Sequence, residues 1–512
     1  MPPDRFVLML LFSALYIQVQ GQEISYYGDI KPIVDRQCVS CHRAGEVGPM
    51  PLTSYEEVSA YGRMIQYVTT SKLMPPWYAD PSYAHYSNER VLSETEIKKI
   101  SNWVSSGMVP GKEPEVPTVP IENHQDRIKR KPDLVISMSE AFEQYGVYLD
   151  QYQVFILPTD LAEDTWIEGI EFVPGNKKIV RFASVSVEPS DKFDSLDRWD
   201  PRYGYFSFGG LGKTPEEPFW YTWSPQQETS FMTDGTARLL PKRSNLLLHI
   251  HYGPTGRPQK DSSVIQLYFA PPAPVQRLMT APLINPYVIT GDSLFIPPDV
   301  KKVFHASYML PYDIELSDLT PQANLLCRSW EVYAKLPDKA TPQKLLKIKE
   351  WNVNWKQTYH LETPVVLPKG TVIHALAHYD NTLDNPCNPS EKPVPFAWGA
   401  HLFSEMFFVH FGFRAVASPT PDVRICMAPV VSDSSLEVLL KLDKTYIAEI
   451  LISNASGNAS AMLEARRFQK GSHKINVPIG SIPYGNYTMT VKDKSGKILA
   501  EQLFVKMREY GL

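Results

Sequence analysis

Two cysteines and a histidine stand close together near the start of the chain, in the run Cys38-Val39-Ser40-Cys41-His42. This is the C-x-x-C-H pattern of covalent haem attachment. The spacing suits that chemistry, because the two thiols can each bond one vinyl group of a haem while the next residue offers an imidazole to the iron. Cysteine and histidine at such short spacing can also hold zinc, so the flanking segments must decide between the two cofactors.

The segments on both sides of the motif have helical patterns. Upstream, apolar residues recur at helical spacing at Ile30, Ile33 and Val34. Downstream, Ser93-Glu94-Thr95-Glu96 is a capping box, and Gly107 is a helix stop. The apolar residues on one face of that downstream segment are Ile97, Ile100 and Val104. The sequence therefore predicts helices that position the motif.

Residues 22–112 resemble a small c-type cytochrome over most of their length. The resemblance implies a small all-α cytochrome c domain in which Cys38 and Cys41 hold haem c and His42 ligates the iron. Its distal methionine corresponds to Met74, in the proline-stiffened run Leu73-Met74-Pro75-Pro76-Trp77. Alternative ligands to the iron are Met50, Met64 and His85.

Residues 1–21 have the features of a secretory signal peptide. Arg5 precedes an apolar run from Phe6 to Ile17, and the small Gly21 follows. No later stretch reaches the ~18 apolar residues of a membrane-spanning helix. We therefore expect an exported protein without a transmembrane segment, in the periplasm or at the cell surface, where disulfides persist.

Composition limits the remaining function classes. The formal net charge of −5 argues against nucleic acid as a partner. The 45 prolines and the alternating apolar patterns after Asp133 favour many short strands. We expect a Pro-rich linker at 113–132, two antiparallel, jelly-roll-like β-sandwiches at 133–272 and 273–428, and a small C-terminal β-sandwich at 429–512.

Several segments of the strand-rich region resemble the type II copper, ascorbate-dependent monooxygenases, the peptidylglycine α-hydroxylating group. The similarity includes bacterial relatives that carry an N-terminal cytochrome c. The matching segments are 208–212, 247–256, 367–371, 379–381 and 398–406. The resemblance implies two consecutive β-sandwiches, each with one copper ion.

Only part of the ligand set implied by this resemblance is present. His251 matches the third histidine of the first copper site, and its neighbour His249 points to the same strand face. Met406 matches the methionine of the second site. Arg181-Phe182 stands where the first site needs two histidines, and Gln322-Ala323-Asn324 replaces a His-x-His pair. Four of the six family ligands are therefore absent, and the arginine and amide side chains that stand in their place suit copper poorly.

Two interpretations follow for the copper region. The sandwiches either persist as a scaffold or binding module without copper, or other histidines rebuild a site. The candidates for a rebuilt site are His374, His378 and His401, which also have ordinary structural explanations. No motif of a nucleotide-binding protein, serine hydrolase or zinc protease is present, and no catalytic residue is assigned.

Three cysteines outside the C-x-x-C-H motif and the C-terminal segment at 429–512 have no role in the sites above. Cys327, Cys387 and Cys426 permit at most one bridge among themselves, and the pair is open. The tail resembles the small β-sandwich sorting domain of proteins secreted by the type IX route, which implies attachment to the outer surface. An ordinary immunoglobulin-like accessory domain is the alternative.

The sequence thus favours an exported electron-transfer protein with haem c. Its partner is a redox protein or a small-molecule electron donor, and the sandwiches serve as a docking or recognition module. One competing hypothesis is a haem- and copper-dependent monooxygenase that hydroxylates a C–H bond with dioxygen. Another is a surface binding protein in which the haem is structural.

Overall fold

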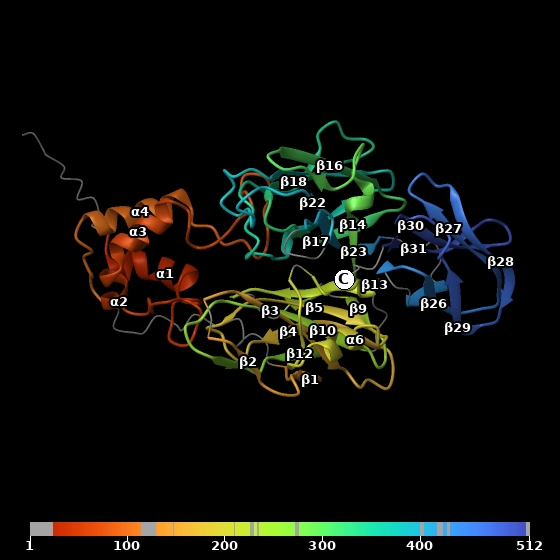
Figure 1. Ribbon diagram of the computed structural model, residues 1–512, viewed down its shortest axis with the longest axis horizontal. Helices are drawn as coiled ribbons and strands as arrows, with labels where there is room; N and C mark the ends of the chain where they lie inside the picture. The colour runs from red at the N-terminus through yellow and green to blue at the C-terminus, as the bar shows by residue number, and fades with distance from the viewer. Residues whose placement is uncertain are drawn as a thin grey trace, which may run out of the picture.

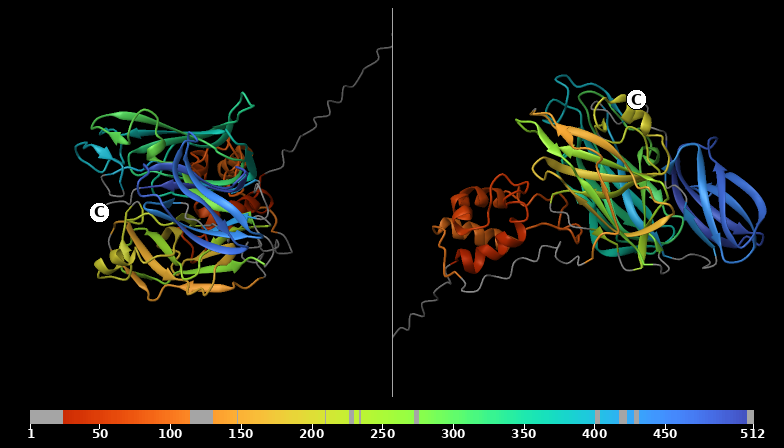
Figure 2. Two further views of the ribbon diagram at one scale, coloured as in Figure 1. Left: turned by 90° about the vertical axis from the view of Figure 1, so that its right-hand side faces the viewer. Right: turned by 90° about the horizontal axis from the view of Figure 1, so that it is seen from below.

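The computed structural model describes residues 24–113, 130–146, 148–208, 210–225, 230–232, 235–271, 276–399, 404–416, 423–427 and 431–507. The expected signal peptide and most of the expected linker lie outside these residues, as does His401. The side chain of Cys426 is likewise outside the described part. Figure 1 and Figure 2 show a helical region at one end, two strand bodies side by side in the middle and a third strand body at the other end.

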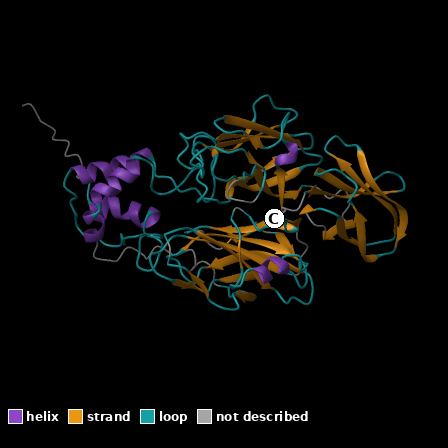
Figure 3. Cartoon of the chain, in the orientation of Figure 1, coloured by secondary structure: helices purple, strands orange, loops and turns teal. Residues whose placement is uncertain are grey.

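The expected fold class was wrong. The described residues are mostly strand, their helices are few and short, and no all-α cytochrome c domain is evident among them (Figure 3). The strands form eight separate sheets of two to six strands rather than jelly rolls. The physical reason lies in the loops, because glycine and proline recur between the short periodic runs and end each one early.

The helical region, residues 24–113, has its own small core. Its elements are η1 (Tyr26–Ile30), α1 (Lys31–Gln37), α2 (Tyr55–Ala60), α3 (Gly62–Thr70) and α4 (Glu94–Ser105). The predicted capping box at the start of α4 is confirmed, since Ser93 and Glu96 bond each other's backbone N–H groups. The longest described helix, α4, has 12 residues, and none in the described ranges is long and apolar enough to cross a membrane.

Part of this N-terminal stretch belongs to the strands instead. Ala79 and Tyr86 form isolated β-bridges with Ile348 and Leu361, and both are buried in the core of the second strand body. The Tyr86 hydroxyl donates to the carbonyl of Leu345 at 2.9 Å. A separate domain over 22–112 therefore describes this region incompletely, because its aromatic loop completes the neighbouring core.

The first strand body contains three sheets around one apolar core. One sheet has the order β6-β3-β10-β5-β7, and a larger one has β1-β12-β4-β9-β13 with β8 paired to β4. A two-stranded sheet joins β11 and β2. The bounds are β1 (Leu134–Ser137), β2 (Phe142–Gln144), β3 (Gln151–Pro158), β4 (Thr165–Val173), β5 (Val180–Glu188), α6 (Asp194–Trp199), β6 (Tyr205–Phe206), β7 (Glu217–Trp223), β8 (Ser230–Phe231), β9 (Thr236–Leu240), β10 (Asn245–Tyr252), β11 (Gln259–Asp261), β12 (Val264–Phe269) and β13 (Gln276–Arg277).

The second strand body has the sheets β14-β23-β17-β20, β16-β21-β18-β19 and β15-β22. Its core contains the largest cluster of buried apolar side chains among the described residues. The bounds are β14 (Met279–Ile284), η2 (Pro286–Val288), β15 (Phe295–Ile296), β16 (Lys301–Met309), β17 (Ile314–Gln322), β18 (Cys327–Lys335), β19 (Gln343–Ile348), β20 (Tyr359–Leu367), β21 (Val372–Asp380), β22 (Phe396–Ala397) and β23 (Phe408–Ala415).

The C-terminal body consists of the sheets β24-β26-β29 and β25-β31-β30-β27-β28. The predicted tail strands are confirmed at these elements, because strict alternation of apolar and polar residues specifies one buried face. The bounds are β24 (Val423–Met427), β25 (Val431–Ser432), β26 (Ser435–Leu442), β27 (Tyr446–Asn454), β28 (Ala459–Phe468), β29 (Gly471–Pro478), β30 (Gly485–Asp493) and β31 (Ile498–Lys506).

Buried polar contacts join the bodies. The hydroxyl of Thr358 lies 2.6 Å from that of Thr222 and 2.8 Å from that of Thr320, which links the first and second bodies. Asn285 donates to Asn486 at 2.7 Å, and both side chains are buried between the second and C-terminal bodies. Such contacts fix relative position, because a buried polar group left without its partner costs about 1–3 kcal/mol.

Candidate functional site

The C-x-x-C-H motif forms a tight turn directly after α1. The amide of Cys41 donates to the carbonyl of Cys38 at 3.1 Å, and the amide of His42 donates to the same carbonyl at 2.9 Å. Both cysteines carry reduced thiols. Burial raises the pKa of the Cys38 thiol to about 12, and the nearby charges of Cys41 and Asp35 add to this effect. The Cys38 thiol is therefore protonated at neutral pH and does not react unaided.

The His42 ring is held in one orientation. Its Nδ1 lies 3.0 Å from the carbonyl oxygen of Met50, so the Nδ1–H tautomer donates there and Nε2 keeps its lone pair. A histidine that binds a metal commonly has its second ring nitrogen bonded in this way. The loop can approach the ring because residue 48 is glycine, and a Cβ there would lie 2.6 Å from the Cys41 carbonyl oxygen.

The residues after the motif leave apolar side chains at the surface. On α3 and the loop after it, Met64 is 54% exposed, Tyr67 is 64% exposed and Met74 is 42% exposed. Tyr61 and Leu73 belong to the same exposed set. Contiguous exposed apolar side chains on a soluble domain commonly mark a binding site.

The alternative iron ligands occupy different surroundings. Met50 is only partly exposed and supplies the carbonyl that holds His42. His85 is exposed, its Nδ1 lies 3.3 Å from Glu89, and its carbonyl accepts from the amide of Glu362 in β20. His85 therefore lies on the side of the aromatic loop that packs against the second strand body.

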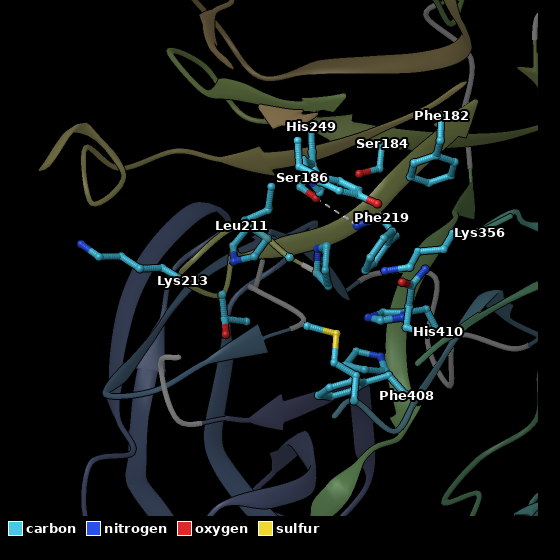
Figure 4. Close-up of a pocket in the computed structure, with 18 of the residues that line it drawn as sticks. Phe182, Ser184, Ser186, Leu211, Lys213, Phe219, His249, Lys356, Phe408 and His410 are labelled. Carbon is cyan, nitrogen blue, oxygen red and sulfur yellow. Dashed lines mark hydrogen bonds between the residues drawn. The ribbon is translucent and has the colours of Figure 1, made fainter. Parts of the chain in front are cut away.

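A pocket lies between the first and second strand bodies, and the C-terminal body closes part of it (Figure 4). It encloses roughly 880 Å³, including the solvent at its mouth. No carboxylate is among its described lining residues. These are Tyr152, Phe182, Ser184, Ser186, Gly210, Leu211, Lys213, Thr214, Pro215, Pro218, Phe219, His249, His251, Pro282, Gln322, Val353, Asn354, Lys356, Met406, Phe408, His410, Val431 and Met507.

The structure brings four sequence-predicted copper positions together in this pocket. His251 and Met406 line it, and so do Phe182 and Gln322, which stand where histidines were expected. The register of β10 explains two of them, because His251 pairs directly with Phe182 of β5. The other replaced positions do not line the pocket, and Asn324 instead donates to the carbonyl of Ser404 at 3.0 Å.

The histidines of β10 are engaged with protein groups. The Nε2 of His249 lies 3.0 Å from the carbonyl of Ser207, and the Nε2 of His251 lies 2.8 Å from Asp150 Oδ1. Tyr152 stacks on the His251 ring at 4.4 Å. Burial lowers the pKa of His249 to about 3, with Lys356 as the next cause, so this ring is neutral. In the described parts of the chain, no three His, Cys, Asp or Glu side chains gather closely enough to hold a metal ion.

The proposed substitute histidines lie elsewhere. His374 and His378 share the outer face of β21, as the sequence indicated, but neither lines the pocket. His374 Nδ1 lies 2.9 Å from His305 Nε2 across the strands, and Tyr333 stacks on it. Cys327 is buried and Cys387 is exposed, and neither forms a disulfide.

Three site residues were missed in the sequence. Lys356 and His410 line the pocket, and Glu405 lies behind Lys356, where it stabilises the charged amine. Burial raises the pKa of Glu405 to about 7, although the backbone amides of Asn324, Leu326 and Met406 donate to it. No motif surrounds these residues, so only a lone histidine in the apolar run of β23 gave a local signal.

Comparisons with known proteins place few limits on function. No family model matches the sequence, and no curated protein matches it. The adhesin domain of Epf from Streptococcus pyogenes is 12% identical, with 40% of this chain and 72% of that chain covered and a TM-score of 0.14. A β-glucuronidase from Faecalibacterium prausnitzii is 13% identical, with 40% and 37% covered and a TM-score of 0.14.

A β-glucosidase from Kluyveromyces marxianus is also similar, at 11% identity, with 41% of this chain and 45% of that chain covered and a TM-score of 0.14. This chain thus spans less than half the length of either glycosidase. Similarity this low carries no argument about fold or function.

Proposed function

We propose that this is an exported c-type haem protein that transfers electrons through the helical region. The proposal rests on the hydrogen bond of the His42 ring. Its Nδ1 bonds the Met50 carbonyl oxygen, so Nε2 is available to a metal. The two reduced thiols that precede it in the same turn supply the covalent attachment points. These donors fit a haem better than zinc, because a structural zinc site needs four ligands and no fourth Cys, His, Asp or Glu joins Cys38, Cys41 and His42 among the described residues.

The surrounding side chains have definite parts in this proposal. Cys38 and Cys41 fix the position of the haem, and His42 ligates its iron. Haem bound there supplies reversible one-electron chemistry, with a redox protein or a small molecule as partner. In this proposal the exposed apolar set on α3 and its following loop would cover the haem and exclude water from it. Met74 lies within that set and is the proposed second ligand to the iron.

The same proposal assigns no copper step to the strand bodies. The expected copper donors are incomplete, and the Nε2 atoms of His249 and His251 already face Ser207 and Asp150. The strand bodies instead serve as a recognition module beside the haem region. The proposed attachment to the cell surface through residues 429–512 is based on the sequence resemblance alone.

The test is haem content in the full mature chain, expressed in a host that attaches haem covalently. We expect about one haem per chain by the pyridine haemochrome assay, retained after denaturation in acid acetone. Cys38→Ala with Cys41→Ala should reduce covalent haem to background, whereas Cys387→Ala should keep it. A wild-type protein that folds without covalent haem in that host would overturn the proposal.

The ligand assignments need a second measurement. Met74→Ala should remove the sulfur-to-iron absorption band, whereas Met64→Ala in the same exposed set should leave that band in place. His42→Ala should convert the iron to a high-spin form. An unchanged spectrum in Met74→Ala would assign the second ligand to another residue.

A further inference from the structure

The amine of Lys356 is an unusual feature of the pocket. Figure 4 shows it reaching into the space between Phe219 and His410. Among the described residues, it makes no hydrogen bond or ion pair. Burial lowers its pKa to about 8, and only the charge of Glu405 opposes this effect. The Lys356 side chain is partly exposed, so its charge is only partly desolvated, and a ligand that supplies hydrogen-bond acceptors would stabilise it.

Two further polar groups of the pocket have no partner. Gln322 Nε2 and His410 Nδ1 are both buried and unbonded in the described structure, and their side chains are 2% and 5% exposed. Burial lowers the pKa of His410 to about 3, and a hydrogen bond with the backbone of Thr320 partly opposes this effect, so the ring is neutral and carries a single N–H. Native proteins rarely leave such donors unsatisfied. The pocket therefore contains one lysine amine and two neutral polar groups without hydrogen-bond partners in the described structure, beside a second lysine, Lys213, whose amine is already bonded.

The rest of the lining is apolar and aromatic. Phe182, Phe219 and Phe408 come from three different strands, and Met406 and Met507 complete the apolar surface. Ring centroids of Phe219 and His410 are 4.4 Å apart across the two bodies, so an aromatic wall continues into the polar end. The absence of any carboxylate from the described lining disfavours a cationic ligand.

We propose that this pocket binds a small monocarboxylic acid with an aromatic or similarly flat apolar body. The carboxylate accepts hydrogen bonds from Lys356, Gln322 and His410, and the apolar body packs among the phenylalanines. The unbonded groups of Lys356, Gln322 and His410 match the two oxygens of one carboxylate, and the largely apolar lining suits an organic acid better than a phosphate, which needs more hydrogen-bond donors. This site is independent of the haem, so failure of either proposal leaves the other standing.

The test uses the full mature chain and three probes of equal shape. By calorimetry at pH 7, 3-phenylpropionate should bind, 3-phenylpropionamide should bind at least tenfold more weakly, and 3-phenylpropylamine should not bind. Lys356→Met should weaken phenylpropionate binding about ten- to hundredfold, because a charged hydrogen bond is lost. Gln322→Leu should weaken it less.

The matched control is Lys301→Met. Lys301 does not line the pocket, and its exposed amine lies 3.3 Å from Asp380 Oδ2. Its removal should change the affinity by less than twofold. Equal affinity for the acid and the amide, or full binding by a folded Lys356→Met variant, would overturn the proposal.

A pH titration of the wild-type protein keeps the proposal testable if the variants fail to fold. Lys356 loses its charge as the pH rises through about 8, while the probe stays anionic, so affinity should fall across that range. Neutral His249 and His410 and the carboxyl of Glu405 are the other titratable groups that face the amine. Affinity that does not change between pH 7 and pH 9.5 contradicts the role of Lys356. Stoichiometric Cu²⁺ binding that displaces the probe would also overturn the proposal and assign the pocket to a metal.

Discussion

The two candidate sites differ in how the chain forms them. The C-x-x-C-H turn is one short segment, whereas the pocket between the strand bodies is built from residues far apart in the sequence. The turn spans five consecutive residues, and its supporting carbonyl comes from Met50, eight positions further on. The pocket combines strands β5, β7, β10, β17 and β23 with Val431 and Met507 from the C-terminal body. A local site keeps its geometry wherever its short segment folds, whereas an assembled site depends on every body that contributes a wall.

The two sites also differ in what they lack. The turn offers two free thiols and an imidazole within five residues, and exposed apolar side chains follow it in the sequence on α3 and the next loop. The pocket opens to solvent at its mouth, and it lacks hydrogen-bond partners for Gln322 Nε2 and His410 Nδ1 in the described structure. The first arrangement suits a large flat cofactor, and the second suits a small anion.

The largest expected effect is the complete loss of one function while the other is retained. Cys38→Ala with Cys41→Ala should abolish covalent haem but leave 3-phenylpropionate affinity unchanged, because the pocket shares no residue with the turn. Lys356→Met should do the reverse. Haem assay and calorimetry on each variant check this, with Cys387→Ala as a control that retains both. Loss of both functions in either variant would show that the sites are coupled.

Tyr359→Ala should weaken the packing of the N-terminal aromatic loop against the second strand body. Tyr359 is fully buried, and its ring lies 5.4 Å from Trp77 and 5.3 Å from Tyr86 of the N-terminal loop. Removal of a buried aromatic ring costs about 3–5 kcal/mol, so urea unfolding should show that loss. Tyr67→Ala, at an exposed aromatic, should stay within about 0.5 kcal/mol. A loss under about 1 kcal/mol for Tyr359→Ala would mean that the loop is held by other contacts.

Acid should destabilise the strand bodies through their neutral histidines. The pKa of His249 and that of His410 are lowered to about 3 by burial. Between that value and the ordinary histidine value of about 6.5, the unfolded chain binds more protons than the folded one, so stability falls as the pH is lowered.

From pH 7 to pH 5 the loss should be on the order of 1–2 kcal/mol per histidine, measured by urea unfolding. His410→Gln should reduce this pH dependence, whereas His378→Gln, at an exposed position, should not. A pH dependence that is the same in wild type and His410→Gln would indicate that other groups control acid stability.

The smallest expected effect concerns the ion pair between the helical region and the first strand body. Lys177 Nζ lies 2.8 Å from Glu46 Oε1, close in sequence to the C-x-x-C-H turn. Partly exposed pairs contribute about 0–1 kcal/mol, so Lys177→Met should change stability little. A double-mutant cycle with Glu46→Gln measures the coupling. A coupling well above 1 kcal/mol would mean that the turn and the strands act as one unit.

Local patterns in the sequence predicted local structure well. Three local predictions are confirmed, because each depends on residues within one turn or one strand. They are the capping box at Ser93, the strands of the C-terminal body, and the shared face of His249 and His251. The architecture was predicted wrongly, since short helical runs were combined into an all-α domain. Helical periodicity does not reveal that an aromatic loop such as Trp77 to Tyr86 packs on a neighbouring sheet.

The sequence by itself determined the spacing of the two thiols and the imidazole in the turn at Cys38, because these groups lie within one segment, and haem attachment there stays a prediction from that spacing. Only the tertiary structure decided the pocket. Lys356, His410 and Met507 are scattered over more than 150 residues, and their proximity follows from strand register and from the docking of three bodies. Burial then changes their chemistry, since the same lysine would be an ordinary solvated cation on an exposed loop.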